Sequence, residues 1–227
     1  MTQFLKNEMA KASKTIRKNI KDGKGLPKEI KMTDNNGKTH TIDKRHYNGL
    51  FEAQNIFIMK NGRYPNYVTL NSTANNPLVM DYQDNGYTCG PTSLSMAIQM
   101  LYSYTSEKEC AKKCGTVIGS GTSPDKLIAG AKSLGYKLTS IPRNYKSVLA
   151  SLDKGKPVIA HIETGGKTKP ACLSFVNNYG HYILIYRAVN SKYYVADPTK
   201  GLKKCDPSMI DKATNGRDIK YYSVGII

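Results

Sequence analysis

The amino-acid sequence predicts an α+β protein in which helices come first and an antiparallel sheet follows. The first observation is helical spacing after Cys89: Leu94, Ala97, Ile98 and Leu101 lie at i, i+3, i+4 and i+7, so one helix face is expected to be buried. The second is a series of apolar runs at 157–162, 180–189, 192–196 and 220–226, rich in β-branched and aromatic residues. Helices followed by such strands are typical of the α+β class.

The chain has 227 residues, which is enough for one sizeable domain and a smaller one. The segment 71–77 is polar and rich in turn-forming residues, so we place a domain boundary there. The predicted domains are residues 1–75 and 76–227.

In the first domain, residues 2–22 are expected to form a basic helix that ends before Gly23 and Gly25. Two alternating segments, 29–33 and 38–42, flank an Asp-Asn-Asn-Gly turn and predict a β-hairpin. Thr41 or Asp43 then caps a helix that stops at Asn61-Gly62, and a short strand over 67–70 completes the domain.

In the second domain, helix starts are marked at Ser106, with Glu109 three residues later, and at Ser123-Pro124. A strand over 136–141 and a short helix over 146–154 precede the remaining strands. The strands 180–189 and 192–196 form a hairpin about the turn 190–192, which brings the start of the first strand beside the end of the second.

The formal net charge is +17, from 34 basic and 17 acidic residues. This charge favours a polyanionic partner without identifying it. Nucleic-acid binding is not expected, because no recognised binding motif accompanies the charge. The sequence contains neither a long apolar run nor a secretory signal, so we expect no membrane association.

Cys89 is the candidate nucleophile. It begins the predicted helix, where unpaired backbone N–H groups and the helix dipole favour a thiolate. Gln83, six residues earlier, is the candidate donor to an oxyanion. The alternative interpretation of Cys89 is a buried structural cysteine at the start of a core helix.

His181 and Asp197 are the candidate partners of this thiol. The hairpin about residues 190–192 places residue 181 opposite roughly residues 197–200, so the imidazole and the carboxylate emerge at the same end of one sheet. In that arrangement Asp197 orients His181, and His181 accepts the thiol proton. His161 lies inside an apolar strand and is expected to be structural; it is the alternative base.

An odd number of cysteines without a secretory signal argues for reduced thiols rather than a disulfide framework. Cys110 and Cys114 share a helix face, so a zinc site with Cys172 and Cys205 is conceivable, but these two supply no second close pair. His40 and His46 are expected to be surface or packing residues, because no ligand spacing accompanies them.

The segment 56–69, IFIMKNGRYPNYVT, resembles the pseudomurein-binding repeat of surface proteins and lytic enzymes of methanogens. The repeat occurs once in this chain. The resemblance implies that residues 1–75 include a small α+β wall-binding module, and exposed Tyr and Arg are favoured contact residues. The expected contacts are Asn61, Arg63, Tyr64, Asn66 and Tyr67.

Gln83, Cys89, His181 and Asp197 together resemble the papain-like cysteine peptidase fold, in which a helix carries the Cys and an antiparallel sheet carries the His and Asp. Combined with the repeat, the chain resembles the pseudomurein endoisopeptidases of viruses of methanogenic archaea. This resemblance implies hydrolysis of the lysine ε-isopeptide cross-link of pseudomurein, with the wall peptide and glycan as partners. It also implies a protein, expected to be monomeric, that is made in the host cytoplasm and acts on the wall at lysis.

No cofactor is expected for the chemistry itself, but the family implies that calcium can support activity. No Asp-x-Asp-x-Asp-Gly loop is present, so metal-binding residues stay unassigned. Two other functions stay open: a peptidase that processes leader peptides and shares the Gln, Cys, His, Asp order, and a catalytically inactive wall-binding module.

Overall fold

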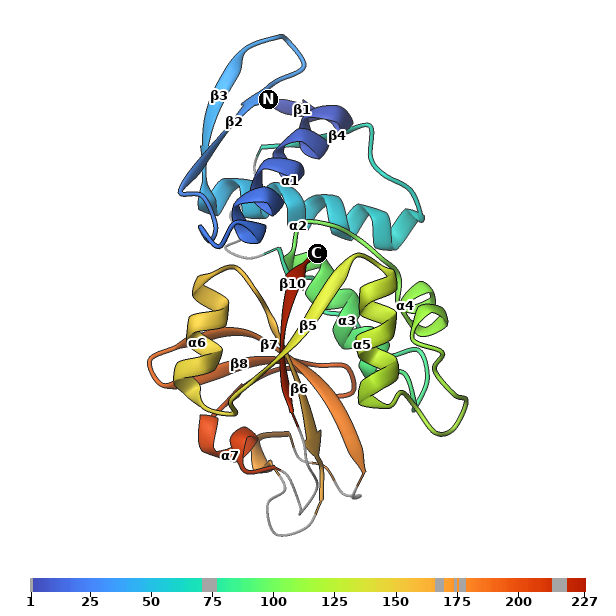
Figure 1. The fold of residues 1–227 in the computed structure, drawn as a ribbon. Coiled ribbons are helices and arrows are strands. Elements are labelled where there is room, and N and C mark those ends of the chain that lie inside the picture. Colours follow the sequence, from blue (N-terminus) through green and yellow to red (C-terminus); the bar gives the residue numbers. More distant parts are fainter. Residues whose placement is uncertain (1, 71–76, 166–169, 174, 176–178, 214–219) are drawn as a thin grey trace.

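An antiparallel sheet of six strands forms the centre of the C-terminal part, in the order β5-β10-β6-β7-β8-β9. We describe this fold from a computed structural model, which covers residues 2–70, 77–165, 170–173, 175, 179–213 and 220–227 (Figure 1). The strands are β5 (Tyr136–Ile141), β6 (Val158–Glu163), β7 (Gly180–Val189), β8 (Lys192–Asp197), β9 (Gly201–Cys205) and β10 (Tyr221–Ile226).

Helices cover both faces of this sheet. On one face lie α3 (Cys89–Met100), α4 (Glu107–Lys113) and α5 (Pro124–Ser133); on the other lies α6 (Tyr145–Asp153). Successive residues of β6 divide between the two sides, since Ile159 joins the α3 core whereas Val158 and Ala160 join the α6 core. Both faces are therefore buried, which confirms the expected α+β class and explains the continuously apolar strand sequences.

The N-terminal part contains two helices, α1 (Lys6–Lys21) and α2 (Lys44–Asn61), and two small sheets. One sheet is the predicted hairpin of β2 (Glu29–Thr33) and β3 (Thr39–Asp43). The other pairs β1 (Gln3–Leu5) with β4 (Tyr67–Thr69). The prediction of helix from residue 2 was wrong, because residues 3–5 pair with a strand distant in sequence and bury Phe4.

Local signals fixed most helix ends as expected. The Asp43 carboxylate accepts from the His46 N–H, and Gly62 closes α2 at φ 65°. The Ser106 and Ser123 hydroxyls cap α4 and α5. Besides β1, the sequence analysis did not anticipate β9, the 3₁₀ helix Ala171–Leu173 or the short helix α7 (Pro207–Asp211).

Tyr102, just after α3, joins the N-terminal helices to the C-terminal sheet. Its hydroxyl donates to Asn48 Oδ1 over 2.7 Å, and its carbonyl accepts from the Ser13 hydroxyl. Its ring makes edge contacts with Tyr47 and Phe51 of α2. One hydrophobic cluster thus includes residues from both parts. The boundary predicted between residues 75 and 76 falls in the segment 71–76, outside the described residues.

Cys172 and Cys205 form a disulfide with a Cα–Cα distance of 5.6 Å. The expectation of reduced thiols was wrong for this pair, because β9 carries Cys205 next to the 3₁₀ turn of Ala171–Leu173. Cys89, Cys110 and Cys114 are free. None of the helices in the described part of the chain combines the length and apolar character that crossing a membrane requires.

Candidate active site

Cys89 is the first residue of α3, so its thiol lies at the positive end of the helix dipole. The helix packs directly on β7, and Gly90 makes this approach possible. A Cβ atom at Gly90 would lie 3.2 Å from the Tyr182 ring and 3.4 Å from the Thr122 side chain. The Cys-Gly pair is therefore needed where the helix meets the sheet.

His181 and Asp197 lie together beside this thiol. His181 Nε2 is 3.0 Å from Asp197 Oδ1, and both side chains are buried, with exposed fractions of 1% and 0%. The same carboxylate oxygen accepts from the Thr199 N–H at 2.7 Å and from the Lys200 N–H at 3.2 Å. The backbone after β8 holds the Asp197 carboxylate, and the carboxylate holds the His181 imidazole. The structure therefore brings together the three residues that the sequence singled out.

Cys89 and His181 line the same cleft, and each shifts the pKa of the other. Burial by itself would raise the pKa of the Cys89 thiol, but the hydrogen bond and charge of His181 lower this pKa below its ordinary value. Backbone N–H groups of Tyr182 and Gly90 add to the decrease. The arrangement favours a thiolate paired with an imidazolium.

His181 shows the opposite shift. Burial acts to lower its pKa, but the hydrogen bonds to Asp197 and Cys89 raise the pKa to about 9. Aromatic rings surround the imidazole: Phe175 and Tyr179 make edge contacts with it at centroid distances of 5.0 and 6.0 Å. These rings limit access of water to the His181–Asp197 bond and so strengthen it.

Gln83 lies in the same cleft as Cys89. Its backbone N–H donates to the Pro198 carbonyl over 3.0 Å, and its Oε1 accepts from the Thr199 hydroxyl over 3.0 Å. Its Nε2 donates to the Asn85 carbonyl over 2.6 Å. An amide nitrogen carries two N–H groups, so this geometry leaves a second donor for a ligand. The turn after Asp197 thus positions Gln83 as well as the carboxylate.

The cleft at Cys89 has a volume of about 490 Å³. Residues 119–124, at the start of α5, form one wall, and Tyr179, Tyr182 and Thr199 contribute to the other. His161 also lines the cleft and stacks on the Tyr182 ring at a centroid distance of 4.4 Å. The alternative base named from the sequence therefore lies in this cleft. Sequence reasoning did not anticipate residues 119–124 there, because only the tertiary fold brings them near Cys89.

The five expected wall contacts are all exposed, at the end of α2, in the loop that follows and at the start of β4. Tyr64 is 43% exposed and has the Lys6 ammonium 5.3 Å from its ring centroid. Arg63 lies over the Phe57 ring, and the Asn61 amide bonds the Phe57 carbonyl. Asn66 and Tyr67 are exposed, Tyr67 by 51%.

His40 and His46 pair with Asp34 and Asp43 at 2.8 and 2.9 Å.

The described residues contain no group of three or more His, Cys, Asp or Glu side chains that could hold a metal ion. The disulfide removes Cys172 and Cys205 from the conceivable zinc site. Cys110 and Cys114 are buried among apolar side chains. The described residues therefore assign no site to the calcium that the resemblance implies, and we derive no step through it.

Comparisons with known proteins place the chain among cysteine peptidases. Residues 66–217 match the model of the Peptidase_C39 like family. The peptidase domain of Streptococcus ComA, a bi-functional ABC transporter involved in quorum sensing, has a similar fold: TM-score 0.50 and 19% identity over 65% of this chain and 98% of that one. A double-glycine-motif protease from an AMS/PCAT transporter, solved with a leader peptide, gives a TM-score of 0.48 and 18% identity over 66% and 92%. No curated protein matches the chain.

Proposed function

The chain belongs to the Peptidase_C39 like family and has a papain-like cysteine peptidase fold, and on this basis we propose that Cys89 is its nucleophile, with His181 as base and Asp197 as the residue that orients it. The observation that carries the proposal is the buried His181–Asp197 hydrogen bond beside the partly exposed Cys89 thiol, whose pKa His181 lowers. Such an arrangement produces the thiolate that attacks a carbonyl carbon.

The roles follow from the positions of the groups. His181 takes the thiol proton, and Sγ of Cys89 forms a bond to the carbonyl carbon of the substrate. Negative charge then develops on the carbonyl oxygen, where the free N–H of Gln83 and the N-terminus of α3 stabilise it. Imidazolium at His181 gives its proton to the departing amine as the C–N bond breaks, which leaves a thioester on Cys89. Water attacks this thioester while His181 accepts one of its protons; the C–S bond then breaks, which releases the carboxylic acid and restores the Cys89 thiolate beside the His181 imidazolium.

For the substrate, we propose the lysine ε-isopeptide cross-link of pseudomurein. The segment 56–69 supports this choice, because it resembles the pseudomurein-binding repeat and carries the exposed Tyr64 and Tyr67. The net charge of +17 is consistent with an anionic wall.

A leader-peptide-processing peptidase is the second candidate. The family match supports it, because residues 66–217 include the whole Cys89 site and omit most of the repeat-like segment. A third reading, an inactive wall-binding module, predicts an unreactive Cys89.

The test is turbidity of purified pseudomurein sacculi under mild reducing conditions, with wild type and Cys89→Ala, each with and without a chelator. Clearing by wild type alone supports the isopeptidase, and the chelator comparison tests calcium dependence. A soluble double-glycine peptide serves as the competing substrate. Cleavage of that peptide without clearing of sacculi favours leader processing, and sedimentation of both proteins with intact sacculi favours the binding module.

Deleting residues 42–70 would not separate these functions, because α2 packs on Tyr102 and its loss would disturb the peptidase core. Tyr67→Ala is a better variant, since that side chain is half exposed. Clearing of sacculi that falls while peptide cleavage stays constant would support wall recognition by the repeat-like segment.

A further inference from the structure

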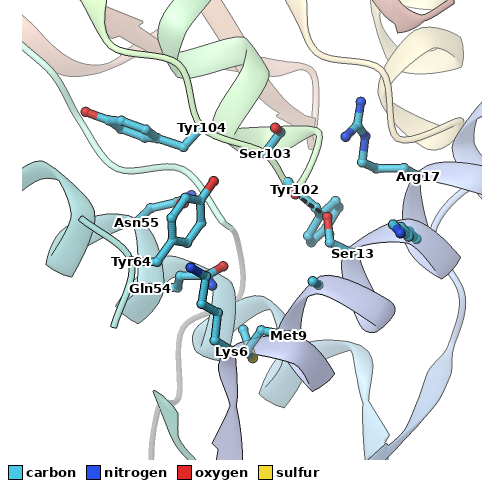
Figure 2. A pocket seen from close by; sticks show the side chains of 12 residues that line it. Lys6, Met9, Ser13, Arg17, Gln54, Asn55, Tyr64, Tyr102, Ser103 and Tyr104 are labelled. Atoms are coloured by element: carbon cyan, nitrogen blue, oxygen red, sulfur yellow. Dashed lines mark hydrogen bonds between the residues drawn. The ribbon is translucent and has the colours of Figure 1, made fainter. Parts of the chain in front are cut away.

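A second cleft, of about 250 Å³, lies between the N-terminal helices and the loop that follows α3 (Figure 2). Side chains from α1 and α2 form its sides, with Tyr64 and the loop residues Ser103 and Tyr104. Cys89 begins α3 and this loop follows its end, so the length of the helix, about 18 Å for 12 residues, separates the two clefts. The proposed catalytic chemistry does not use this second cleft.

The cleft is positively charged. Lys6, Lys14 and Arg17 reach it from one face of α1, and no lining residue is acidic. Within the described residues none of these three cations has an ion pair, whereas Lys11 and Lys18 of the same helix pair with Glu8 and Asp22. Lys21, which also has no ion pair in the described part of the chain, lies away from the cleft and donates to the Ile227 carbonyl instead.

Asn55 adds a donor that lacks an acceptor. This side chain of α2 is only 3% exposed, and its Nδ2 makes no hydrogen bond in the described structure. Figure 2 shows it beside Tyr64 at the edge of the cleft. A buried N–H group without an acceptor is unfavourable. Because this atom is closed to solvent, a ligand oxygen reaches it only when the neighbouring side chains shift, and the hydrogen bond gained then adds affinity.

We propose that this cleft binds a carboxylate of an acidic peptide. A carboxylate is acceptor-only and takes charge-assisted hydrogen bonds from Lys and Arg, and a peptide carbonyl or carboxylate oxygen satisfies Asn55 Nδ2. The phenol groups of Tyr64 and Tyr104 flank the cleft as further donors. Lys6 lies over one face of the Tyr64 ring, which leaves that face closed to stacking by a sugar ring. These contacts favour a peptide over an acidic saccharide.

The test uses the full chain with Cys89→Ala, so that binding is measured without hydrolysis and independently of the proposed reaction. The probes are tri-glutamate and tri-glutamine, both with blocked ends, and tri-galacturonate. Side-chain amide signals of Asn55 are followed by NMR, with the assignment made from Asn55→Asp. We expect saturable shifts with tri-glutamate and none with tri-glutamine.

The matched variants are Lys14→Gln/Arg17→Gln inside the cleft and Lys11→Gln/Lys18→Gln outside it, which remove equal charge from the same helix. The first pair should weaken tri-glutamate binding by roughly fivefold or more, and the second by less than about twofold. Equal losses in both pairs would overturn the proposal in favour of general charge attraction. No shift at Asn55, or tighter binding of tri-galacturonate than of tri-glutamate, would also overturn it.

Discussion

The Nε2 atom of His181 lies 3.0 Å from Oδ1 of Asp197, with both side chains excluded from solvent. Two backbone N–H groups, from Thr199 and Lys200, bind the same carboxylate oxygen. The turn after β8 therefore fixes the carboxylate, and the carboxylate fixes the ring that lies in the cleft with Cys89.

Asp197→Asn should lower kcat by roughly 10⁴-fold, less than the roughly 10⁶-fold expected for loss of Cys89 or His181. The asparagine keeps the shape but removes the charge that helps to raise the pKa of His181 to about 9. In wild type, activity should fall at low pH as Cys89 is protonated and above about pH 9 as His181 loses its proton. In the pH profile of kcat, the decrease at alkaline pH should therefore begin at a lower pH for Asp197→Asn than for wild type.

The raised pKa of His181 also makes the stability of the fold depend on pH. The folded pKa of His181, about 9, exceeds its ordinary value of about 6.5, so its contribution to stability is complete below the ordinary value and is lost as pH rises through the folded one. The melting temperature of wild type should therefore fall more than that of Asp197→Asn between pH 6 and pH 10. A parallel fall in both proteins would contradict the assigned coupling.

His181→Ala and His161→Ala separate the two imidazoles of the cleft. We expect loss of His161 to reduce kcat by less than about tenfold, because His161 stacks on Tyr182 and is not part of the proposed triad. Loss of His181 should abolish turnover while circular dichroism shows a retained fold. A larger loss for His161→Ala would identify His161 as the base instead.

Gln83→Ala should lower kcat by about 10²- to 10³-fold with little change in KM, because the donor acts on charge that develops in the transition state. Thr199→Val removes only the hydroxyl that holds Gln83 Oε1 and should cost less. Initial rates over a range of substrate concentrations measure both effects. An unchanged kcat in Gln83→Ala would exclude this residue from the oxyanion site.

Cys172→Ser should lower the free energy of unfolding by about 3–4 kcal/mol, because the disulfide closes a loop across 33 positions. Thermal melts with and without a strong reductant provide the control. The reductant should lower the melting temperature of wild type to that of the variant and leave the variant unchanged. An insensitive wild type would mean that the pair is not bonded.

The sequence predicted the elements that carry their own end signals. Asp43, Ser106 and Ser123 cap helices, and the turn at 34–37 forms the first hairpin. It also predicted the proximity of His181 and Asp197, because a short hairpin turn constrains the register. These features depend on residues close together in the chain.

Long-range pairing explains what was missed. Residues 3–5 form a strand only because Tyr67–Thr69 lies beside them, and no side chain caps the start of α1 at Leu5. The Cys172–Cys205 bond depends on β9, a five-residue strand that contains no β-branched or aromatic residue. The odd number of cysteines was interpreted as evidence for reduced thiols. However, five cysteines can also form one disulfide and leave three free thiols, as the structure shows.

The most direct test of the central claim is the pH dependence of Cys89 alkylation by iodoacetamide, followed by peptide mapping in wild type and His181→Ala. The Cys89 pKa is lowered by His181, whereas burial raises the pKa of Cys114 to about 12 and that of Cys110 further. We predict that Cys89 alone reacts at neutral pH, with a midpoint below the ordinary pKa of a cysteine thiol that rises when His181 is removed. A wild-type midpoint at or above that value, or one unaffected by His181→Ala, would contradict the thiolate–imidazolium pair on which the proposed function rests.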